Sequence, residues 1–237
     1  MRILITNDDG IRGEGLLHLT KWAQTLGEVV VSAPMVEQSA KSHTIEIHKP
    51  FRAEKVEYLP GVTAWAVDSS PADCVRFALL GLKLEFDLAI SGVNRGLNVG
   101  RDMMYSGTIG AACEAVNLGL KAVALSTPPG YYSHATDHLD QVLDFFCRNN
   151  LLDVHNLYNV NIPANPKEIR ITHQGGPYYS DDFPPIGNDL YRPTGKSVWV
   201  DRNDYTLDTD ATLNGYITVT PMTVDRTDWS IYSKLIK

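Results

Sequence analysis

Short apolar runs alternate with longer amphipathic stretches along the first 165 residues of the chain. Within each short run the apolar residues are nearly continuous and rich in Val, Ile, Leu and Ala, which is typical of strands buried on both faces of a sheet. Polar, glycine or proline residues follow each run. The pattern predicts strands within residues 2–6, 28–34, 63–71, 87–94 and 121–127.

The longer stretches repeat their apolar residues at helical spacing. In residues 15–27, for example, Leu16, Leu19 and Trp22 fall on one helical face, and Gly27 suits the C-terminal end of a helix. The same spacing recurs between the later strands. It predicts helices within residues 15–27, 71–82, 106–120 and 137–150.

This alternation of strands and helices is typical of an α/β protein whose parallel sheet is covered by helices on both faces. Ligands of such sheets bind beyond the carboxyl ends of the strands. Two polar clusters fall at such ends, Asn7-Asp8-Asp9 after the first strand and Ser91-Gly92-Val93-Asn94 at the end of the fourth. We therefore expect the functional site at this edge of the sheet.

The pattern changes after residue 164. Residues 168–201 are rich in Tyr, Pro, Gly and Asp and predict a long hairpin or extended arm. A late strand is predicted at 215–222 and a terminal helix within 225–237. We divide the chain into a core, residues 1–164, and an extension, residues 165–237. Such an arm can join subunits or act as a mobile flap over a site.

Composition narrows the possible functions. The chain has 237 residues, 43% of them hydrophobic, and a net charge of -7, which argues against binding nucleic acid polymers or anionic membranes. Small anionic substrates need only local positive charge. The three cysteines form no CxxC motif, which suits a reducing compartment. Neither a signal peptide nor a membrane-spanning run is visible, so we expect a cytoplasmic protein.

Asp8 and Asp9 are the first candidate for chemistry. A bare acidic pair is more often a solvated loop or a helix cap, but carboxylates at the end of the first strand suit a hard divalent cation such as Mg²⁺, Mn²⁺ or Ca²⁺. Ser39, in the loop after the second strand, is a weak neutral oxygen ligand, and a lone loop serine is usually solvated.

Three familiar motifs are missing near these residues. Gly10, Gly13 and Gly15 have the spacing G-x-x-G-x-G, which is not the G-x-G-x-x-G of a dinucleotide-binding turn. Neither a Walker A sequence nor a G-x-S-x-G nucleophile elbow occurs in the chain. The sequence therefore disfavours nicotinamide or flavin dinucleotide binding, a P-loop and a serine hydrolase of that type.

The segment 91–115 is the second candidate, because glycines and two asparagines, Asn94 and Asn98, fill the loop between a buried strand and a helix. Glycine allows the backbone to approach a ligand closely, and asparagine offers an oxygen to a cation or an amide to a phosphate. Unpaired N–H groups at the start of a helix attract anions. The helix start that we expect to bind an anion consists of Ser106, Gly107 and Thr108.

Five separated motifs resemble the SurE survival protein family of metal-dependent nucleotidases. They are ILITNDDGIRGEGL, VVVSAPMVEQS, SSPADCVRFAL, DLAISGVNRGLNVGRDMMYSGTIGAACEA and NVNIP, in the family order. The C-terminal third resembles the family more loosely, through ITHQGGPYY and GYITVTPM. After Ser39 the chain lacks the glycine-containing stretch of the family.

The resemblance implies a Rossmann-like fold with a C-terminal extension, and dimers or tetramers that exchange C-terminal elements. It implies phosphomonoesterase activity on nucleoside 5′- and 3′-monophosphates, and for some members on short polyphosphate. The implied ligands of one divalent metal ion per subunit, Mg²⁺ or Mn²⁺, are Asp8, Asp9, Ser39 and Asn94. The implied phosphate-binding residues are Asn98, Ser106, Gly107 and Thr108.

Elementary electrostatics agrees with this assignment. Two carboxylates, a hydroxyl and an amide would bring a divalent ion close to neutrality and leave it attractive to a phosphate dianion. Our hypothesis is metal-activated hydrolysis of nucleoside monophosphates, with Asp8 and Asp9 at the reaction centre and the role of either as base or nucleophile open. The alternatives are a haloacid-type phosphatase with an aspartate nucleophile, and a non-catalytic module that senses nucleotide or metal.

Overall fold

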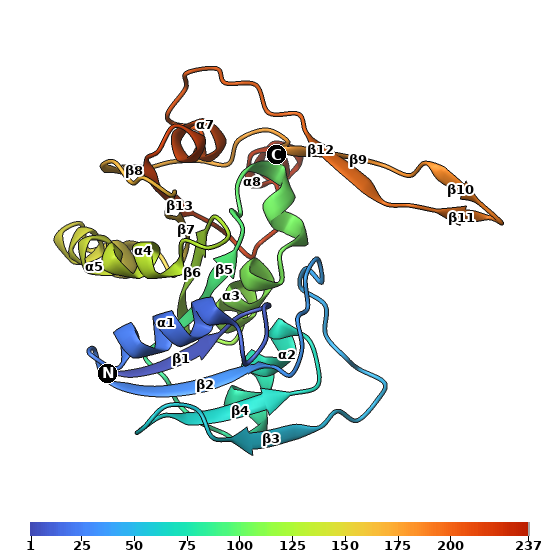
Figure 1. Ribbon diagram of the computed structural model, residues 1–237. Coiled ribbons are helices and arrows are strands. Elements are labelled where there is room, and N and C mark those ends of the chain that lie inside the picture. Colours follow the sequence, from blue (N-terminus) through green and yellow to red (C-terminus); the bar gives the residue numbers. More distant parts are fainter. Residues whose placement is uncertain (237) are drawn as a thin grey trace.

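One mixed sheet organises the molecule, in a computed structural model that describes residues 1–236 (Figure 1). Its nine strands have the order β3-β4-β2-β1-β5-β6-β7-β13-β8. The strands are β1 Arg2–Thr6, β2 Glu28–Pro34, β3 Ala53–Val56, β4 Thr63–Val67, β5 Leu88–Arg95, β6 Lys121–Thr127, β7 Leu157–Asn161, β8 Ile169–Ile171 and β13 Ile217–Pro221. Only β3 and β13 pair antiparallel, with β4 and β7, so the expected mostly parallel sheet is confirmed.

Helices cover both faces of this sheet, as the sequence predicts. Ile3 and Ile5 of β1 face the core that contains Leu16 of α1, whereas Leu4 between them faces the core that contains Val75 of α2. The first core also contains α4 and α5, and the second contains α3. The helices are α1 Glu14–Ala23, α2 Pro71–Arg76, α3 Gly107–Asn117, α4 Tyr132–Asp137, α5 Leu139–Arg148, α6 Leu151–Val154, α7 Asp208–Leu213 and α8 Trp229–Leu235.

The expected arm is present and projects from the body as a long hairpin (Figure 1). It consists of two small antiparallel sheets, β9 Tyr179–Asp182 with β12 Thr194–Ser197, and β10 Pro185–Gly187 with β11 Leu190–Tyr191. The late strand is β13, which pairs with β7 inside the main sheet. The extension therefore contributes two strands, β8 and β13, to the main sheet as well as an arm.

Several elements differ from the pattern-based prediction. Residues 71–82 do not form one α-helix, because a five-residue π-helix, Phe77–Gly81, follows α2. The stretch before residue 150 contains two helices, α4 and α5. The terminal helix begins at Trp229, and residue 237 of its predicted range lies outside the described residues. Within residues 1–236, no helix has the length and apolar character needed to cross a membrane.

Candidate functional site

The turn after β1 presents Asp8 and Asp9 at the carboxyl end of the central strand. Asn7 is fully buried, and its side chain accepts the Gly10 N–H (3.2 Å) and donates to the Gly10 carbonyl (3.0 Å). Gly10 has a φ of +94°, a left-handed conformation that favours glycine. The Ile11 N–H then donates to the Pro34 carbonyl at 2.7 Å. In this cluster Asn7 shapes the turn, whereas Asp8 and Asp9 make their contacts with other segments of the chain.

Asp8 contacts the start of α3 directly. The Thr108 hydroxyl and N–H donate to its two carboxylate oxygens at 2.6 and 3.2 Å. A side chain on Gly107 would place its Cβ 2.9 Å from the Cβ of Asp8, so this close approach requires glycine. Ser106 caps the helix by accepting the Ile109 N–H at 3.2 Å. Two of the donors expected to bind phosphate therefore orient Asp8 in this structure.

Asp9 lies beside Asp8 but has a different environment. Its carboxylate accepts the Arg95 N–H at 3.0 Å, and the Arg95 Nε lies 4.0 Å away. Burial raises the pKa of Asp9 to about 6, with a further contribution from the Asp8 charge, and Arg95 opposes this rise. Burial also raises the pKa of Asp8, although its hydrogen bonds to Thr108 act in the opposite direction. The pair is thus short of compensating positive charge.

Ser39 and Asn94 lie near the aspartates because the residue next to each of them in the chain forms a hydrogen bond with Asp8 or Asp9. Beside Ser39, the Gln38 N–H donates to the Asp8 carbonyl at 2.7 Å. Beside Asn94, Arg95 contacts Asp9 as described. The Ser39 hydroxyl itself donates to Glu37 at 2.6 Å, and the Asn94 amide donates to the Gly96 carbonyl at 2.8 Å. The four predicted metal ligands therefore come from the loops after β1 and β2 and from the end of β5, and the neighbours Gln38 and Arg95 contact the two aspartates.

Asn98 takes part in a buried network instead of contacting the start of α3. Its side-chain amide donates to Ser126 at 2.8 Å, and its N–H donates to Asn161 at 2.8 Å. The Asn98 carbonyl accepts from both Asn159 and Asn161, at 2.8 and 2.9 Å. The sequence alone does not indicate that these two asparagines position Asn98, although both belong to the motif NVNIP and lie in β7. The network fixes the glycine-rich loop that follows β5.

Asp208, in the extension, supports the same loop from its other side. Its buried carboxylate accepts the Gly100 N–H at 3.0 Å and the Gly175 N–H at 2.7 Å. A Cβ on Gly100, whose φ is +60°, would lie 2.1 Å from the Gly176 carbonyl. The sequence contains no local signal for this contact, because 108 residues separate Asp208 from Gly100.

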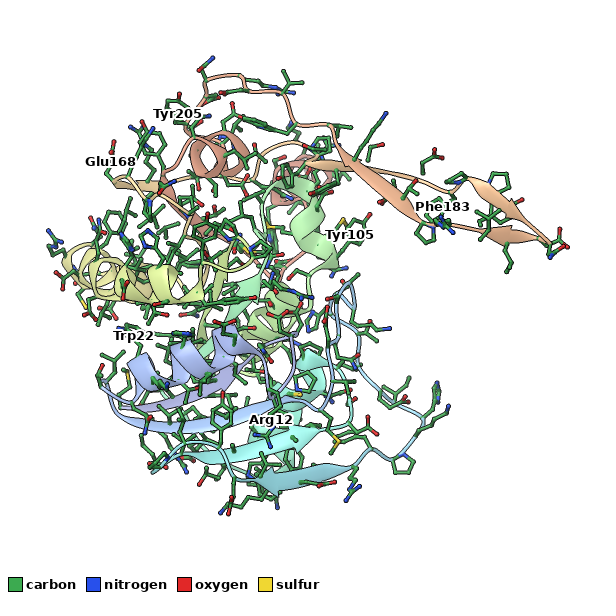
Figure 2. All side chains as sticks on the ribbon, viewed as in Figure 1. Arg12, Trp22, Tyr105, Glu168, Phe183 and Tyr205 are labelled. Atoms are coloured by element: carbon green, nitrogen blue, oxygen red, sulfur yellow. The ribbon has the colours of Figure 1, made fainter. Side chains whose placement is uncertain are left out.

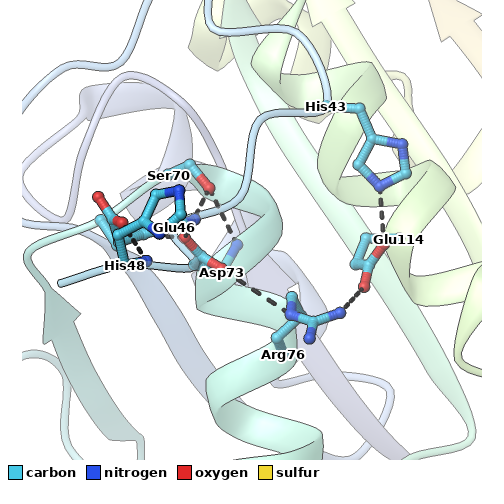
Figure 3. Close-up of polar contacts among 8 residues, drawn as sticks. His43, Glu46, His48, Ser70, Asp73, Arg76 and Glu114 are labelled. Atoms are coloured by element: carbon cyan, nitrogen blue, oxygen red, sulfur yellow. Dashed lines mark hydrogen bonds and ion pairs between the residues drawn. The ribbon is translucent and has the colours of Figure 1, made fainter. Parts of the chain in front are cut away.

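A partly buried hydrogen-bond network around Glu114 holds the loop between β2 and β3, residues 35–52, which carries Ser39 (Figure 3). Glu114 of α3 accepts from His43 at 2.7 Å and from Arg76 of α2 at 2.8 Å. Burial acts to raise the pKa of Glu114, but its hydrogen bonds with His43 and Arg76 hold that pKa below the ordinary value. In this loop Ala40 and Ser42 have φ values of +57° and +53°, a left-handed conformation that is uncommon for residues other than glycine.

A divalent cation suits the donors at the end of β1. Carboxylate, hydroxyl and amide oxygens are hard ligands of the kind that Mg²⁺ and Mn²⁺ take. A cation here would also offset the burial and the Asp8 charge, which together raise the pKa of Asp9. Within residues 1–236 no three His, Cys, Asp or Glu side chains gather as a metal-binding group, so a metal at this place requires the neutral donors too.

Comparison with known proteins agrees with the geometry. Residues 3–181 match the family model described as "Survival protein SurE". The 5′-nucleotidase SurE of Pelotomaculum thermopropionicum is 37% identical over 247 residues, covering 100% of this chain and 95% of that protein. The 5′-nucleotidase SurE of Petrotoga mobilis is 36% identical, with 99% and 98% covered.

A solved structure extends the likeness to the whole fold. The crystal structure of the SurE protein from Aquifex aeolicus superposes with a TM-score of 0.82 at 27% sequence identity, covering 99% of this chain and 98% of that one. The match includes the extension as well as the core. On the family match and the full-length relatives together, this chain belongs to the SurE family.

Proposed function

We propose that the protein is a 5′-nucleotidase that hydrolyses nucleoside monophosphates to nucleoside and phosphate with one bound divalent ion, Mg²⁺ or Mn²⁺. The observation that carries this proposal is the pair of adjacent carboxylates at the end of β1, with Asp8 buried against the start of α3 and Asp9 partly buried beside it. The curated relatives that match the full chain are named 5′-nucleotidases, which supports the substrate class.

In this proposal Asp8, Asp9, Ser39 and Asn94 hold the metal. When bound, such an ion polarises a phosphoryl oxygen and lowers the pKa of a water ligand. Thr108 fixes the direction of the Asp8 carboxylate through two hydrogen bonds. Arg95 reduces the negative charge beside Asp9 and so eases the approach of an anionic ester.

The phosphate would lie at the start of α3, among Ser106, Gly107 and Thr108. The helix dipole at the start of α3 favours a phosphoryl group there. Asn98 acts through its buried network, which fixes the loop leading to this helix. The proposal assigns Asp8 and Asp9 to the metal and assigns proton transfer to neither of them.

Three finer features complete the proposal. The enzyme also accepts nucleoside 3′-monophosphates and short polyphosphate, as the family resemblance implies. It forms a homodimer or homotetramer by exchange of C-terminal elements, which is supported by the projecting hairpin. It works in the cytoplasm, where its three free cysteines would stay reduced.

The decisive assay is release of inorganic phosphate from a panel of nucleoside monophosphates, with EDTA and with added Mg²⁺ or Mn²⁺. Wild-type protein should require the metal, and Asp8→Asn should lower kcat/KM more than about a hundredfold because a charged ligand is lost. The matched control is Asp144→Asn on α5, an exposed carboxylate that should leave activity unchanged.

The outcomes separate the alternatives. Near wild-type turnover by Asp8→Asn would overturn the metal assignment. A trapped aspartyl-phosphate would instead indicate the haloacid-type mechanism. Metal or nucleotide binding without phosphate release under any condition would indicate a sensing module.

A further inference from the structure

One motif of the extension has no part in the proposed metal and phosphate sites. It is ITHQGGPYY, residues 171–179, which leads from the end of β8 into the hairpin. This segment lies along a short 3₁₀-helix, η2 Gly100–Tyr105, which connects the loop after β5 to the start of α3. Figure 2 shows Tyr105 of η2 beside the base of the hairpin, whose outer part contains Phe183.

Hydrogen bonds join this segment to the first turn of η2. The Gln174 side-chain amide donates to the Gly100 carbonyl at 3.0 Å. One residue further along η2, the Arg101 N–H donates to the Gly176 carbonyl at 3.1 Å. The segment and η2 therefore advance side by side, and the first turn of η2 is bonded to the extension at successive residues.

The next residue of η2, Asp102, makes the charged contact of this series. Its carboxylate accepts the N–H groups of Tyr178 and Tyr179 at 2.9 and 2.7 Å. A carboxylate forms stronger hydrogen bonds with N–H groups than a neutral acceptor does. Because β9 begins at Tyr179, these two N–H groups lie at the base of the hairpin. Asp102 therefore fixes η2 to the place where the hairpin leaves the body of the molecule.

A helix of this kind depends on contacts with its surroundings. Runs of 3₁₀-helix longer than about four residues are uncommon because their hydrogen-bond geometry is poor, and η2 has six residues. At its far end the Ser42 N–H donates to the Tyr105 carbonyl at 2.9 Å, and the Ser42 hydroxyl donates to the Met104 carbonyl at 2.7 Å. The extension thus holds the first half of η2, and the β2–β3 loop holds its end.

The end of η2 continues directly into the proposed phosphate position. Ser106 follows Tyr105, and its N–H donates to the Met103 carbonyl at 3.1 Å in the last turn of η2. Ser106 also caps α3, as described above. Thr108 is held separately, by Asp8. A displacement of η2 would therefore displace Ser106 first.

We infer that Asp102 is a positioning residue for phosphate binding, which fixes η2 to the base of the hairpin and so keeps Ser106 in place. The inference rests on the proposed nucleotidase function for the position of the phosphate. The metal ligands depend on other contacts, because the network around Glu114 holds the loop that carries Ser39. Loss of the Asp102 contact should therefore weaken phosphate binding and leave the metal requirement unchanged.

Inhibition by inorganic phosphate measures this effect. Asp102→Ala should raise the inhibition constant of phosphate and the KM for adenosine 5′-monophosphate about tenfold each, with kcat within about twofold of wild type, because binding is lost equally in the ground and transition states. The Mg²⁺ concentration for half-maximal activity should stay within about twofold. Asp102→Asn should recover most of the loss, because its amide oxygen can accept the same two N–H groups.

The matched control is Asp181→Ala, which replaces an exposed aspartate on β9 of the hairpin and should change none of these quantities. Gln174→Ala removes a neutral contact of the same segment and should raise the inhibition constant of phosphate severalfold. This second variant keeps the test valid if Asp102→Ala does not fold.

Two measurements are independent of catalysis. Calorimetry with inorganic phosphate at saturating Mg²⁺ should show about tenfold weaker binding for Asp102→Ala, and hydrogen exchange of residues 100–106 should be faster in this variant than in wild type. If the wild type releases no phosphate from any substrate but Asp102→Ala weakens phosphate binding, the proposed hydrolysis fails and the positioning role stands. Unchanged phosphate binding in both Asp102→Ala and Gln174→Ala, or an equal loss in Asp181→Ala, would overturn the positioning role.

Discussion

At the residue scale, the two adjacent aspartates differ in what surrounds them. Asp8 is oriented by the Thr108 hydroxyl and N–H, whereas Asp9 is bonded to the Arg95 N–H and lies near its guanidinium. Arg95, whose Nε lies 4.0 Å from Asp9, offsets only part of the negative charge of the pair, so ionising both carboxylates in the metal-free protein is unfavourable. A bound cation would remove this unfavourable electrostatic energy and would therefore bind more tightly.

The pH dependence of the metal-free protein should reveal this cost at Asp9. Its pKa is about 6 in the folded protein against an ordinary 3.8, so the ionised group destabilises the folded state. The penalty is fully present above pH 6 and disappears as the pH falls toward 4. Asp9→Asn should therefore raise the free energy of unfolding at pH 7.5 by about 1–3 kcal/mol, and by much less at pH 4.5.

Urea unfolding in EDTA at the two pH values measures this difference, and Asp144→Asn provides an exposed carboxylate for comparison. Saturating Mg²⁺ should reverse the order, because wild-type protein alone gains the full binding free energy. A variant that is less stable than wild type at pH 7.5 without metal would show that Asp9 is not under electrostatic strain.

Single residues also show how far a sequence can define a site. The meeting of Asp8 and Thr108 at one edge of the sheet was predictable because one follows a strand and the other begins a helix, where parallel sheets bind ligands. Asp208 and Asn159 were not, because their role depends on which distant backbone group they reach. An isolated polar residue in a sequence carries no information about such a partner.

At the element scale, buried strands were predicted well and partly exposed ones poorly. The apolar runs of β1, β2 and β6 leave little choice of structure, because both faces of each strand are covered. The edge strand β3, with the sequence AEKV, is short and polar, so its sequence did not predict a strand. Its pairing with β4 defines it in the structure. The π-helix after α2 was also not predicted, because its sequence FALLG suits an α-helix equally well.

The β2–β3 loop is the element whose position matters most for the proposed metal site. It carries Ser39, and Glu114 holds it against α2 and α3 through His43 and Arg76 (Figure 3). Glu114→Gln keeps the shape of the side chain but removes the charge. We expect it to lower the free energy of unfolding by about 1–3 kcal/mol, because charged hydrogen bonds in a buried site are lost.

Kinetics should show that this loss acts on the loop. The Mg²⁺ concentration for half-maximal phosphate release should rise severalfold in Glu114→Gln, while kcat at saturating metal stays within about twofold of wild type. Glu28→Gln, which breaks the exposed pair with Arg2, is the control and should change neither quantity. Equal metal requirements for the two variants would refute a role of the network in placing Ser39.

At the scale of the whole molecule, the extension is bound to the core at several places, one of them the base of the hairpin, where the Tyr178 and Tyr179 N–H groups donate to Asp102. Strand β13 lies in the main sheet beside β7, and Asp208 supports the loop after β5. The hairpin is different, because all residues of its four strands are exposed. Its exposed apolar side chains include Phe183, Ile186, Leu190 and Tyr191, and such a group of side chains marks a protein contact surface.

Shortening the hairpin should therefore separate subunits without unfolding them. Replacing residues 182–194 with Asn-Gly retains the Asp181 pairing with Gly195 and supplies a two-residue turn. We expect the free energy of unfolding of the subunit to stay within about 1 kcal/mol of wild type, because little buried surface is removed. The mass in sedimentation equilibrium should fall to a smaller multiple of 26.2 kDa. Val154→Ser, which removes an exposed apolar side chain elsewhere, should leave the mass unchanged. An unchanged mass for the shortened protein would assign the hairpin to another role, such as a flap over the site.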